Sequence, residues 1–255
     1  MVVHSKFVIN DSNWKQITAD LTHPRGYRGM WLSDGARSAA PSFRDQTQIK
    51  LLTDTEIDER IDQAERDKAT LKDFALDMNV ECLDQGRTNY CWINAPVFCA
   101  MLRRLIETGQ EHRYSPASGG AVIKGFQNVG GWGSQALAFM IENGINYQSD
   151  WPPNAIDRRY YTAENREKAK LNRVTEYYRL ETWQEVKSCI AQKIPCGLGY
   201  NWWRHEVTGM CLTLRSHNLE IANSWGNWGD RGYGTLEGSR RYPDDAVAIV
   251  SMTAA

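Results

Sequence analysis

The chain has 255 residues, of which 42% are hydrophobic and 24% are charged. This composition supplies enough apolar side chains for one large domain or two smaller lobes with a hydrophobic core, and it excludes a disordered chain. Because 30 basic and 31 acidic residues leave a formal net charge of −1, we expect no nucleic acid and no anionic membrane among its partners.

The N-terminal part of the sequence gives few signals. Residues 1–10 lack the cationic start and long apolar core of a signal peptide, and no stretch approaches the roughly eighteen apolar residues that span a membrane. We therefore expect a cytoplasmic protein with no membrane partner. Gly, Pro and Arg in residues 23–29 suggest turns, and we assign no chemistry to residues 1–50.

The first clear helix follows this region. Thr53 and Glu56 have the spacing of a capping box, and apolar residues recur after them at helical intervals between charges. This pattern predicts a helix over about residues 54–69.

A polar, glycine-containing loop at residues 84–90 precedes a helical pattern over residues 91–106, and Cys91 stands at the junction. A thiol at a helix N-terminus is close to unpaired backbone N–H groups, which favour the thiolate and therefore a nucleophile. Gln85 can place its side-chain amide beside the same helix start, as a donor to an oxyanion. Pro96 conflicts with this helix and is expected to bend or delay it.

Glycine pairs and capping boxes mark the middle of the chain. Gly130-Gly131 is followed by Trp132 and by a predicted helix over residues 134–143, with Gly144 as its C-terminal cap. Taken alone, the glycine pair also fits a loop turn that needs positive φ. Residues 163–172 predict a charged surface helix. A second capping box at residues 182–185 predicts a helix that ends near residue 192.

The C-terminal third has the pattern of strands. Five short runs are rich in strand formers and separated by glycines, at residues 196–200, 206–214, 218–223, 232–237 and 245–251. His205 precedes the second run, and the sequence Asn223-Ser224-Trp225-Gly226 follows the third.

The order Gln-Gly, Cys-Trp, Gly-Gly, His and Asn-Ser-Trp-Gly resembles the papain family of cysteine peptidases. The resemblance covers about residues 72–251. It implies an α+β, papain-like fold with two lobes, a helical lobe at about 85–160 and a β-barrel-like lobe at about 174–251, with the active-site cleft between them. Residues 1–70 would then be an N-terminal extension or prosegment-like region before a catalytic domain over 71–255.

The resemblance assigns a role to each site residue. Cys91 is the nucleophile, His205 the acid–base group, Asn223 the residue that orients the imidazole, and Gln85 an oxyanion donor. Trp225 is expected to shield the His–Asn hydrogen bond from water. No metal or other cofactor is implied.

Four further residues are expected to bind substrate. Gly130 and Gly131 correspond to a pair that binds extended backbone, and Trp132 to an aromatic wall of the pocket for the second residue before the cut. Glu206 follows the catalytic His beside the same pocket, where a carboxylate favours Arg. Alternatively, Glu206 pairs with Arg204 on the protein surface.

Two departures from the family pattern stand out. Tyr90, just before the nucleophile, is bulkier than the usual residue and is expected to change the shape of the primary pocket. Thr88 and Asn128 stand where secreted family members have a disulfide, and the six cysteines have no metal-ligand spacing, which fits a reducing compartment.

The expected function is a cysteine-type endopeptidase that forms a thioester with a peptide or protein substrate. One alternative is a papain-fold amidase or acyltransferase that acts on a non-protein amide, such as a cell-wall peptide or an isopeptide. A third hypothesis is an inactive binding protein. It does not explain why all four catalytic residue types are present. The sequence gives no oligomeric state.

Overall fold

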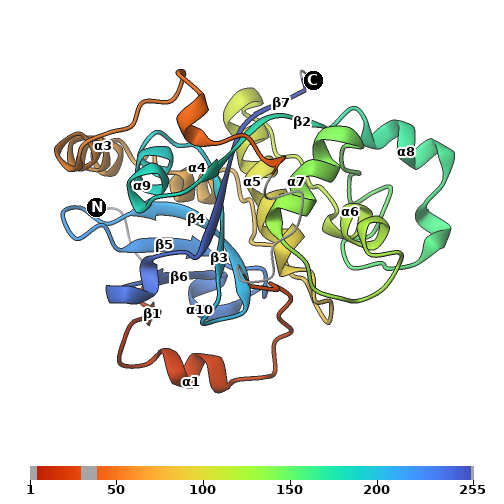
Figure 1. The fold of residues 1–255 in the computed structure, drawn as a ribbon, viewed down its shortest axis with the longest axis horizontal. Coiled ribbons are helices and arrows are strands. Elements are labelled where there is room, and N and C mark those ends of the chain that lie inside the picture. The colour runs from red at the N-terminus through yellow and green to blue at the C-terminus, as the bar shows by residue number, and fades with distance from the viewer. Residues whose placement is uncertain (1–4, 30–38, 254–255) are drawn as a thin grey trace.

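The computed structural model describes residues 5–29 and 39–253. Most of the helices lie in the first two thirds of the chain, and most of the strands lie in the last third (Figure 1). The helices are α1 Trp14–Ala19, α3 Asp54–Asp67, α4 Leu71–Asp77, α5 Cys91–Thr108, α6 Pro116–Ile123, α7 Gly133–Glu142, α8 Ala163–Ala169, α9 Trp183–Ala191 and α10 Trp228–Arg231. The strands are β1 Val8–Ile9, β2 Val174–Leu180, β3 Cys196–Tyr200, β4 His205–Leu212, β5 Leu219–Ala222, β6 Tyr233–Leu236 and β7 Asp245–Met252.

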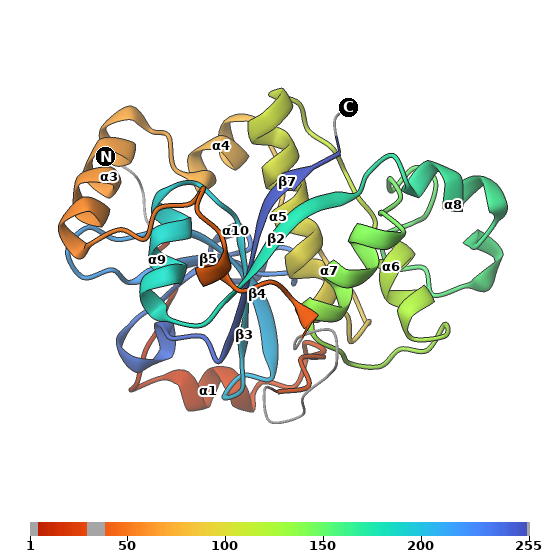
Figure 2. The same cartoon turned by 45° about the horizontal axis from the view of Figure 1, so that its top comes forward.

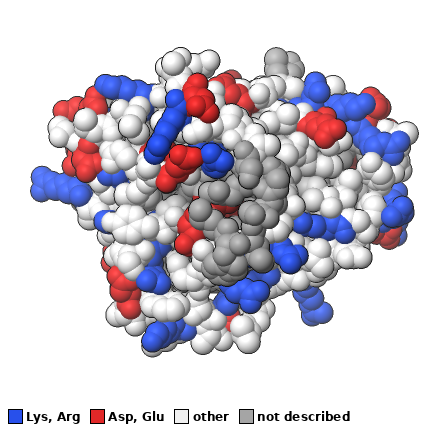
Figure 3. Space-filling view, in the orientation of Figure 1, with Lys and Arg blue, Asp and Glu red and all other residues white. Residues whose placement is uncertain are grey.

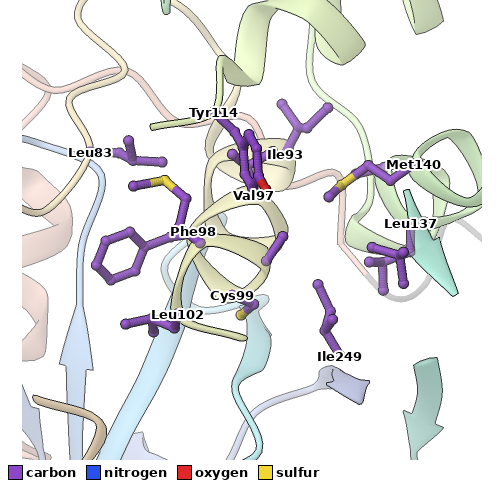
Figure 4. Packing of buried hydrophobic residues seen from close by; sticks show 14 of the residues in the cluster. Leu83, Ile93, Val97, Phe98, Cys99, Leu102, Tyr114, Leu137, Met140 and Ile249 are labelled. Carbon is purple, nitrogen blue, oxygen red and sulfur yellow. The ribbon is translucent and has the colours of Figure 1, made fainter. Parts of the chain in front are cut away.

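Helix α5 runs through the centre of the molecule. It packs against α6 and α7 on one side and against β3, β4 and β7 on the other, so nearly all of its residues are buried. Figure 4 shows Leu137 and Met140 of α7 and Ile249 of β7 around it. The helix begins at Cys91 and continues through Pro96, so the predicted delay is wrong. Packing from both sides offsets the hydrogen bond that proline removes.

The strands form one open, seven-stranded sheet in the order β1-β6-β5-β4-β3-β7-β2. All neighbours are antiparallel except β1 and β6, which are parallel. The five predicted strand regions are confirmed, and they belong to a single sheet that is not closed into a barrel. Helix α9 covers one face of β4 and α5 covers the other (Figure 2), which explains why every residue of β4 is buried.

The other predicted helices are confirmed with small shifts in their ends. The capping boxes at Thr53 and Thr182 are both formed, with Glu56 and Glu185 as their acidic partners. Helix α7 is followed by Gly144 with a φ of 74°, and a Cβ there would lie 1.9 Å from the Ala169 carbonyl oxygen. Only glycine fits this turn.

The N-terminal region is attached to the C-terminal third of the chain at two places. Val8 and Ile9 pair with β6, and the Asp11 carboxylate accepts a hydrogen bond from the Ser239 backbone N–H over 2.9 Å. Farther along, apolar residues of 49–61 belong to the same buried cluster as α9 and β3. The domain boundary at residue 70 stays a prediction.

Candidate active site

Cys91 occupies the first position of α5, as predicted, and its side chain is fully buried. The Gly26 backbone N–H donates a hydrogen bond to Cys91 Sγ over 3.1 Å. Burial raises the pKa of the Cys91 thiol to about 12, which outweighs the favourable position at the helix start. The helix N-terminus alone would favour a Cys91 thiolate, but in this structure burial favours the protonated thiol.

His205 and Asn223 lie at the ends of adjacent strands. His205 begins β4, Asn223 follows β5, and His205 Nε2 is 2.7 Å from Asn223 Oδ1. Because an amide oxygen only accepts, Nε2 carries the proton and Nδ1 has a free lone pair. Nδ1 has no hydrogen-bond partner among the described residues. Burial, with smaller effects of the Arg25 and His23 charges, lowers the pKa of His205 to about 3.

Trp225 lies over this pair. Its ring centroid is 4.2 Å from that of His205, and its side chain is itself buried. His23, which no sequence pattern selects, stacks on Trp225 with ring centroids 4.7 Å apart. The two rings separate the His205–Asn223 hydrogen bond from solvent.

Gln85 is buried beside Ser224, the residue after Asn223. Its Oε1 accepts from Ser224 Oγ over 2.6 Å, and its Nε2 donates to the Thr88 carbonyl over 2.7 Å and to the Pro24 carbonyl over 3.0 Å. Trp225 Nε1 donates to the same Pro24 oxygen over 3.2 Å. The amide predicted as an oxyanion donor thus already binds a carbonyl oxygen.

Residues 24–29, called the covering segment below, lie across the site. The Tyr27 N–H donates to the Arg204 carbonyl over 3.2 Å. Gly131 N–H donates to the Gly26 carbonyl over 2.9 Å, and Arg28 N–H donates to the Gly131 carbonyl over 3.1 Å. Tyr27 and Gly131 therefore form a parallel bridge. The sequence assigns no chemistry to residues 1–50, yet the structure places this segment against Cys91.

Close approach, rather than backbone conformation, explains the glycine pair. Neither Gly130 nor Gly131 has positive φ, so the turn interpretation is wrong. A Cβ on Gly130 would lie 2.3 Å from the Gly26 carbonyl oxygen, and one on Gly131 would lie 2.7 Å from the Trp92 ring. A side chain at Gly130 would keep the covering segment away, and one at Gly131 would collide with Trp92.

Trp132 holds the far end of the covering segment. Its Nε1 donates to the Gly29 carbonyl over 3.1 Å, and the Arg28 guanidinium lies 5.6 Å from its ring centroid. Trp132 thus forms an aromatic wall beside the covering segment, and its role in a substrate pocket stays a prediction.

Comparisons with known proteins bear on the fold. No protein-family model and no curated protein sequence matches the chain. Among solved structures, xylellain, a cysteine protease from Xylella fastidiosa, is similar with a TM-score of 0.57 and 16% identity over 98% of this chain and 99% of that one. The chain has the papain-like fold.

Two further structures share that fold. A digestive procathepsin L 3 from Tenebrio molitor larval midgut has a TM-score of 0.59 and 14% identity over 97% of this chain and 84% of that one. The proform of the ragweed pollen cysteine protease Amb a 11 has a TM-score of 0.53 and 16% identity over 68% of this chain and 62% of that one.

Within the papain-like fold, hydrogen bonds stand where secreted members have a disulfide. Asn128 Oδ1 accepts from the Asn89 backbone N–H over 2.6 Å, and Asn128 Nδ2 donates to the Arg87 carbonyl over 3.0 Å. All six cysteines are free. The loop before the nucleophile is thus attached to the glycine-pair loop without a covalent link.

Two departures from the papain-like pattern take unexpected positions. The Tyr90 side chain is buried and donates to the Gln127 carbonyl over 2.7 Å, with its ring against Gly120 of α6. Glu206 is 2% exposed, and its carboxylate accepts from the Gly133 backbone N–H, so surface pairing with Arg204 is wrong. Burial and the nearby Asp245 charge raise the pKa of Glu206 well above its usual range.

No group of His, Cys, Asp and Glu within residues 5–29 and 39–253 is arranged to hold a metal ion. Across the same part of the chain, no helix is both long and apolar enough to cross a membrane. Acidic and basic side chains alternate on the face in Figure 3, in keeping with the small net charge.

Proposed function

We propose that the protein is a cysteine endopeptidase that cuts peptide bonds through a thioester on Cys91. Cys91 transfers its thiol proton to His205 and its Sγ attacks the scissile carbonyl. His205 gives that proton to the leaving amine, and Asn223 keeps the imidazole oriented. Gln85 Nε2 and the Cys91 backbone N–H stabilise the oxyanion. Water then hydrolyses the thioester with His205 as base.

The backbone of the covering segment is the observation that carries this proposal. Gly131 bonds to extended main chain on both sides of Tyr27, and the Pro24 carbonyl oxygen lies against Gln85 Nε2. These contacts involve backbone groups that every polypeptide carries. A site that holds its own chain in this way suits a peptide or protein substrate.

The same contacts describe an idle state. With the covering segment in place, burial keeps the thiol protonated, with a pKa of about 12, and the imidazole neutral, with a pKa of about 3. The Cys–His ion pair that activates the nucleophile needs hydration or substrate in place of this cover. Catalysis therefore begins with displacement of residues 24–29.

Displacement of the covering segment does not require loss of the N-terminal region. Before the segment, β1 pairs with β6, and after it the Arg179 backbone N–H donates to the Pro41 carbonyl over 2.8 Å. Both anchors lie in the β-sheet lobe and involve neither Cys91 nor His205. The segment can lift away while residues 5–12 and 41–52 keep their places.

The alternative activity, on a non-protein amide, has no comparable support. Cell-wall fragments and isopeptides present side-chain amides and sugars that do not use an extended main-chain partner at Gly131. The third hypothesis, an inactive binding protein, gives no reason for the His205–Asn223 geometry. The cytoplasmic location expected from the sequence stays a prediction.

Hydrolysis of reduced, denatured casein by the full chain tests the proposal. We would compare Tyr27→Ala, which loosens the covering segment, with Tyr27→Ala carrying either Cys91→Ala or Cys99→Ala. Cys99 is a matched control because it is a buried thiol on the same helix. We expect activity in the first and third variants and none in the second. Equal activity in all three would refute the nucleophile assignment.

A further inference from the structure

Two indole rings form a corner around the imidazole of His205. The ring centroid of Trp203 is 5.0 Å from that of His205, and the ring centroid of Trp225 is 4.2 Å from it. The planes of Trp203 and Trp225 are perpendicular, with an interplanar angle of 90° and centroids 5.7 Å apart. Both indoles therefore lie within the roughly 6 Å over which an aromatic ring attracts a cation.

A short turn brings Trp203 to this position. Strands β3 and β4 are paired as far as Tyr200 and His205, so only residues 201–204 connect them. Arg204 ends the turn with a φ of 53°, in the left-handed region that residues other than glycine seldom adopt. The conformation of this turn holds the Trp203 ring against the imidazole at the start of β4.

Packing alone does not explain a tryptophan at position 203. The side chain of Trp203 is 1% exposed, yet its Nε1 has no hydrogen-bond partner among the described residues. A buried N–H without an acceptor lowers stability, and phenylalanine or leucine would fill a hydrophobic core without that loss. Indole differs from those side chains because it attracts cations most strongly. The residue type thus points to a neighbouring cation.

The neighbouring group that can become a cation is His205. In the proposed reaction its imidazole takes the thiol proton of Cys91 and stays positively charged until the proton passes to the leaving amine. The charged side chains that face the ring are Arg25, from the covering segment, and His23, from the residue before that segment, and both disfavour its protonation. Asn223 contributes a neutral hydrogen-bond acceptor. Attraction to the indole rings opposes the effect of the two cations.

We propose that Trp203 is a positioning residue that works with Trp225 to stabilise the positively charged form of His205 during the reaction. This inference rests on the proposed peptidase function and adds a residue to it that acts through His205 and not on the substrate. When the covering segment is displaced, Trp203 should widen the pH range in which the imidazole is protonated by about 0.5–1 unit.

An NMR titration of His205 tests the proposal without catalysis. The parent is the full chain with Cys91→Ala and Tyr27→Ala, which removes the thiol and loosens the covering segment, and His205→Gln identifies the signal. At position 203, tryptophan is replaced by analogues with one, two and three ring fluorines, which weaken the attraction for a cation and nearly keep the shape. We expect the pKa of His205 to fall stepwise, by about 0.5 unit over the series. A pKa that stays the same, or rises with fluorine content, would overturn the proposal.

Trp202 supplies the matched control. Its ring is stacked on that of Trp203, with centroids 5.2 Å apart and an interplanar angle of 9°, and it also contacts the rings of Trp14 and Tyr200. The same fluorinated series at position 202 should leave the pKa of His205 unchanged. Equal falls at positions 202 and 203 would show a general effect of fluorine in this aromatic cluster and would refute a specific role for Trp203.

Hydrolysis of a fluorogenic peptide by the Tyr27→Ala variant connects the inference with function. At high pH, kcat/KM falls as the imidazolium loses its proton, and we expect this alkaline limb to move to lower pH by the same amount over the series at position 203. Hydrolysis with an alkaline limb that does not move would refute the role of Trp203 but leave the peptidase function intact. The expected fall in the pKa of His205 without any hydrolysis would refute the peptidase function and retain Trp203 as a residue that stabilises the imidazolium.

Discussion

The Gly26 backbone N–H donates a hydrogen bond to Cys91 Sγ over 3.1 Å, although sixty-five residues separate the two in the chain. The proposed nucleophile is therefore covered by main chain rather than by a side chain. Any polypeptide that replaces this segment presents the same backbone N–H and carbonyl groups to Gln85 and Gly131. The contact between Gly26 and Cys91 thus links the idle form of the protein with its proposed substrate.

Gly26→Ala should open the site. A Cβ on Gly26 would lie 1.8 Å from the Asn89 carbonyl oxygen, so the segment cannot keep its present path with alanine there. We expect labelling of Cys91 by iodoacetamide to rise at least about tenfold relative to wild type. The double variant with Cys91→Ala shows how much labelling comes from the other thiols. An unchanged rate would mean that the segment does not restrict access to Cys91.

Lower pH should favour the open form. The pKa of His205 is about 3 while the imidazole is buried under the covering segment, and it returns toward about 6.5 when water reaches the ring. At a pH between these two pKa values, His205 binds a proton when the covering segment is displaced but not when the segment is in place. The open population should therefore rise by up to about tenfold for each pH unit below 6.5.

Hydrogen exchange of the Gly131 amide, which bonds to the Gly26 carbonyl, measures this opening in the Cys91→Ala variant. After correction for the intrinsic exchange rate, protection should fall between pH 7 and pH 5. His205→Gln should remove the dependence on pH. Equal protection at both pH values in the presence of His205 would show that the imidazole does not control opening.

Asn223→Ala should reduce activity without abolishing it. The 2.7 Å hydrogen bond to His205 orients the imidazole, but Trp225 still confines the ring. We expect kcat/KM to fall by about 10–100-fold in a Tyr27→Ala background, against at least about a thousandfold for His205→Ala. Equal losses in the two variants would assign Asn223 a larger role than orientation.

Reductant should restore activity without changing stability. All six cysteines are free, and oxidation of Cys91 removes the nucleophile. We expect a denatured sample to yield six thiols per chain by reaction with Ellman's reagent, and the melting temperature to stay the same with and without dithiothreitol. A count well below six in freshly reduced protein would reveal a disulfide.

The sequence predicted those parts of the fold that local signals determine. Thr53 and Thr182 begin helices through capping boxes, and the strand runs after residue 195 follow their own apolar pattern. Strand β2 was missed because register shifts near Glu176 break the alternation, and β1 because two residues give no period. Both strands depend on partners remote in sequence.

Some parts of the candidate site could likewise be predicted from local sequence signals, and others could not. The residue types and order around Cys91, His205 and Asn223 were enough to select them, and the structure brings His205 and Asn223 into contact. The covering segment has no periodicity, and its partner Gly131 lies far along the chain, so no local signal pointed to it. The direction of Glu206 depends on the Gly133 backbone, which the sequence does not reveal.

The central claim is a thioester on Cys91. The most direct test mixes the Tyr27→Ala variant with a peptide p-nitrophenyl ester, quenches in acid and maps the modified residue by mass spectrometry. We predict that the acyl group is attached to the tryptic peptide that contains Cys91, and that Cys91→Ala carries none. Ester hydrolysis with the acyl group on another residue, or with no acyl-enzyme and full activity in Cys91→Ala, would contradict the account.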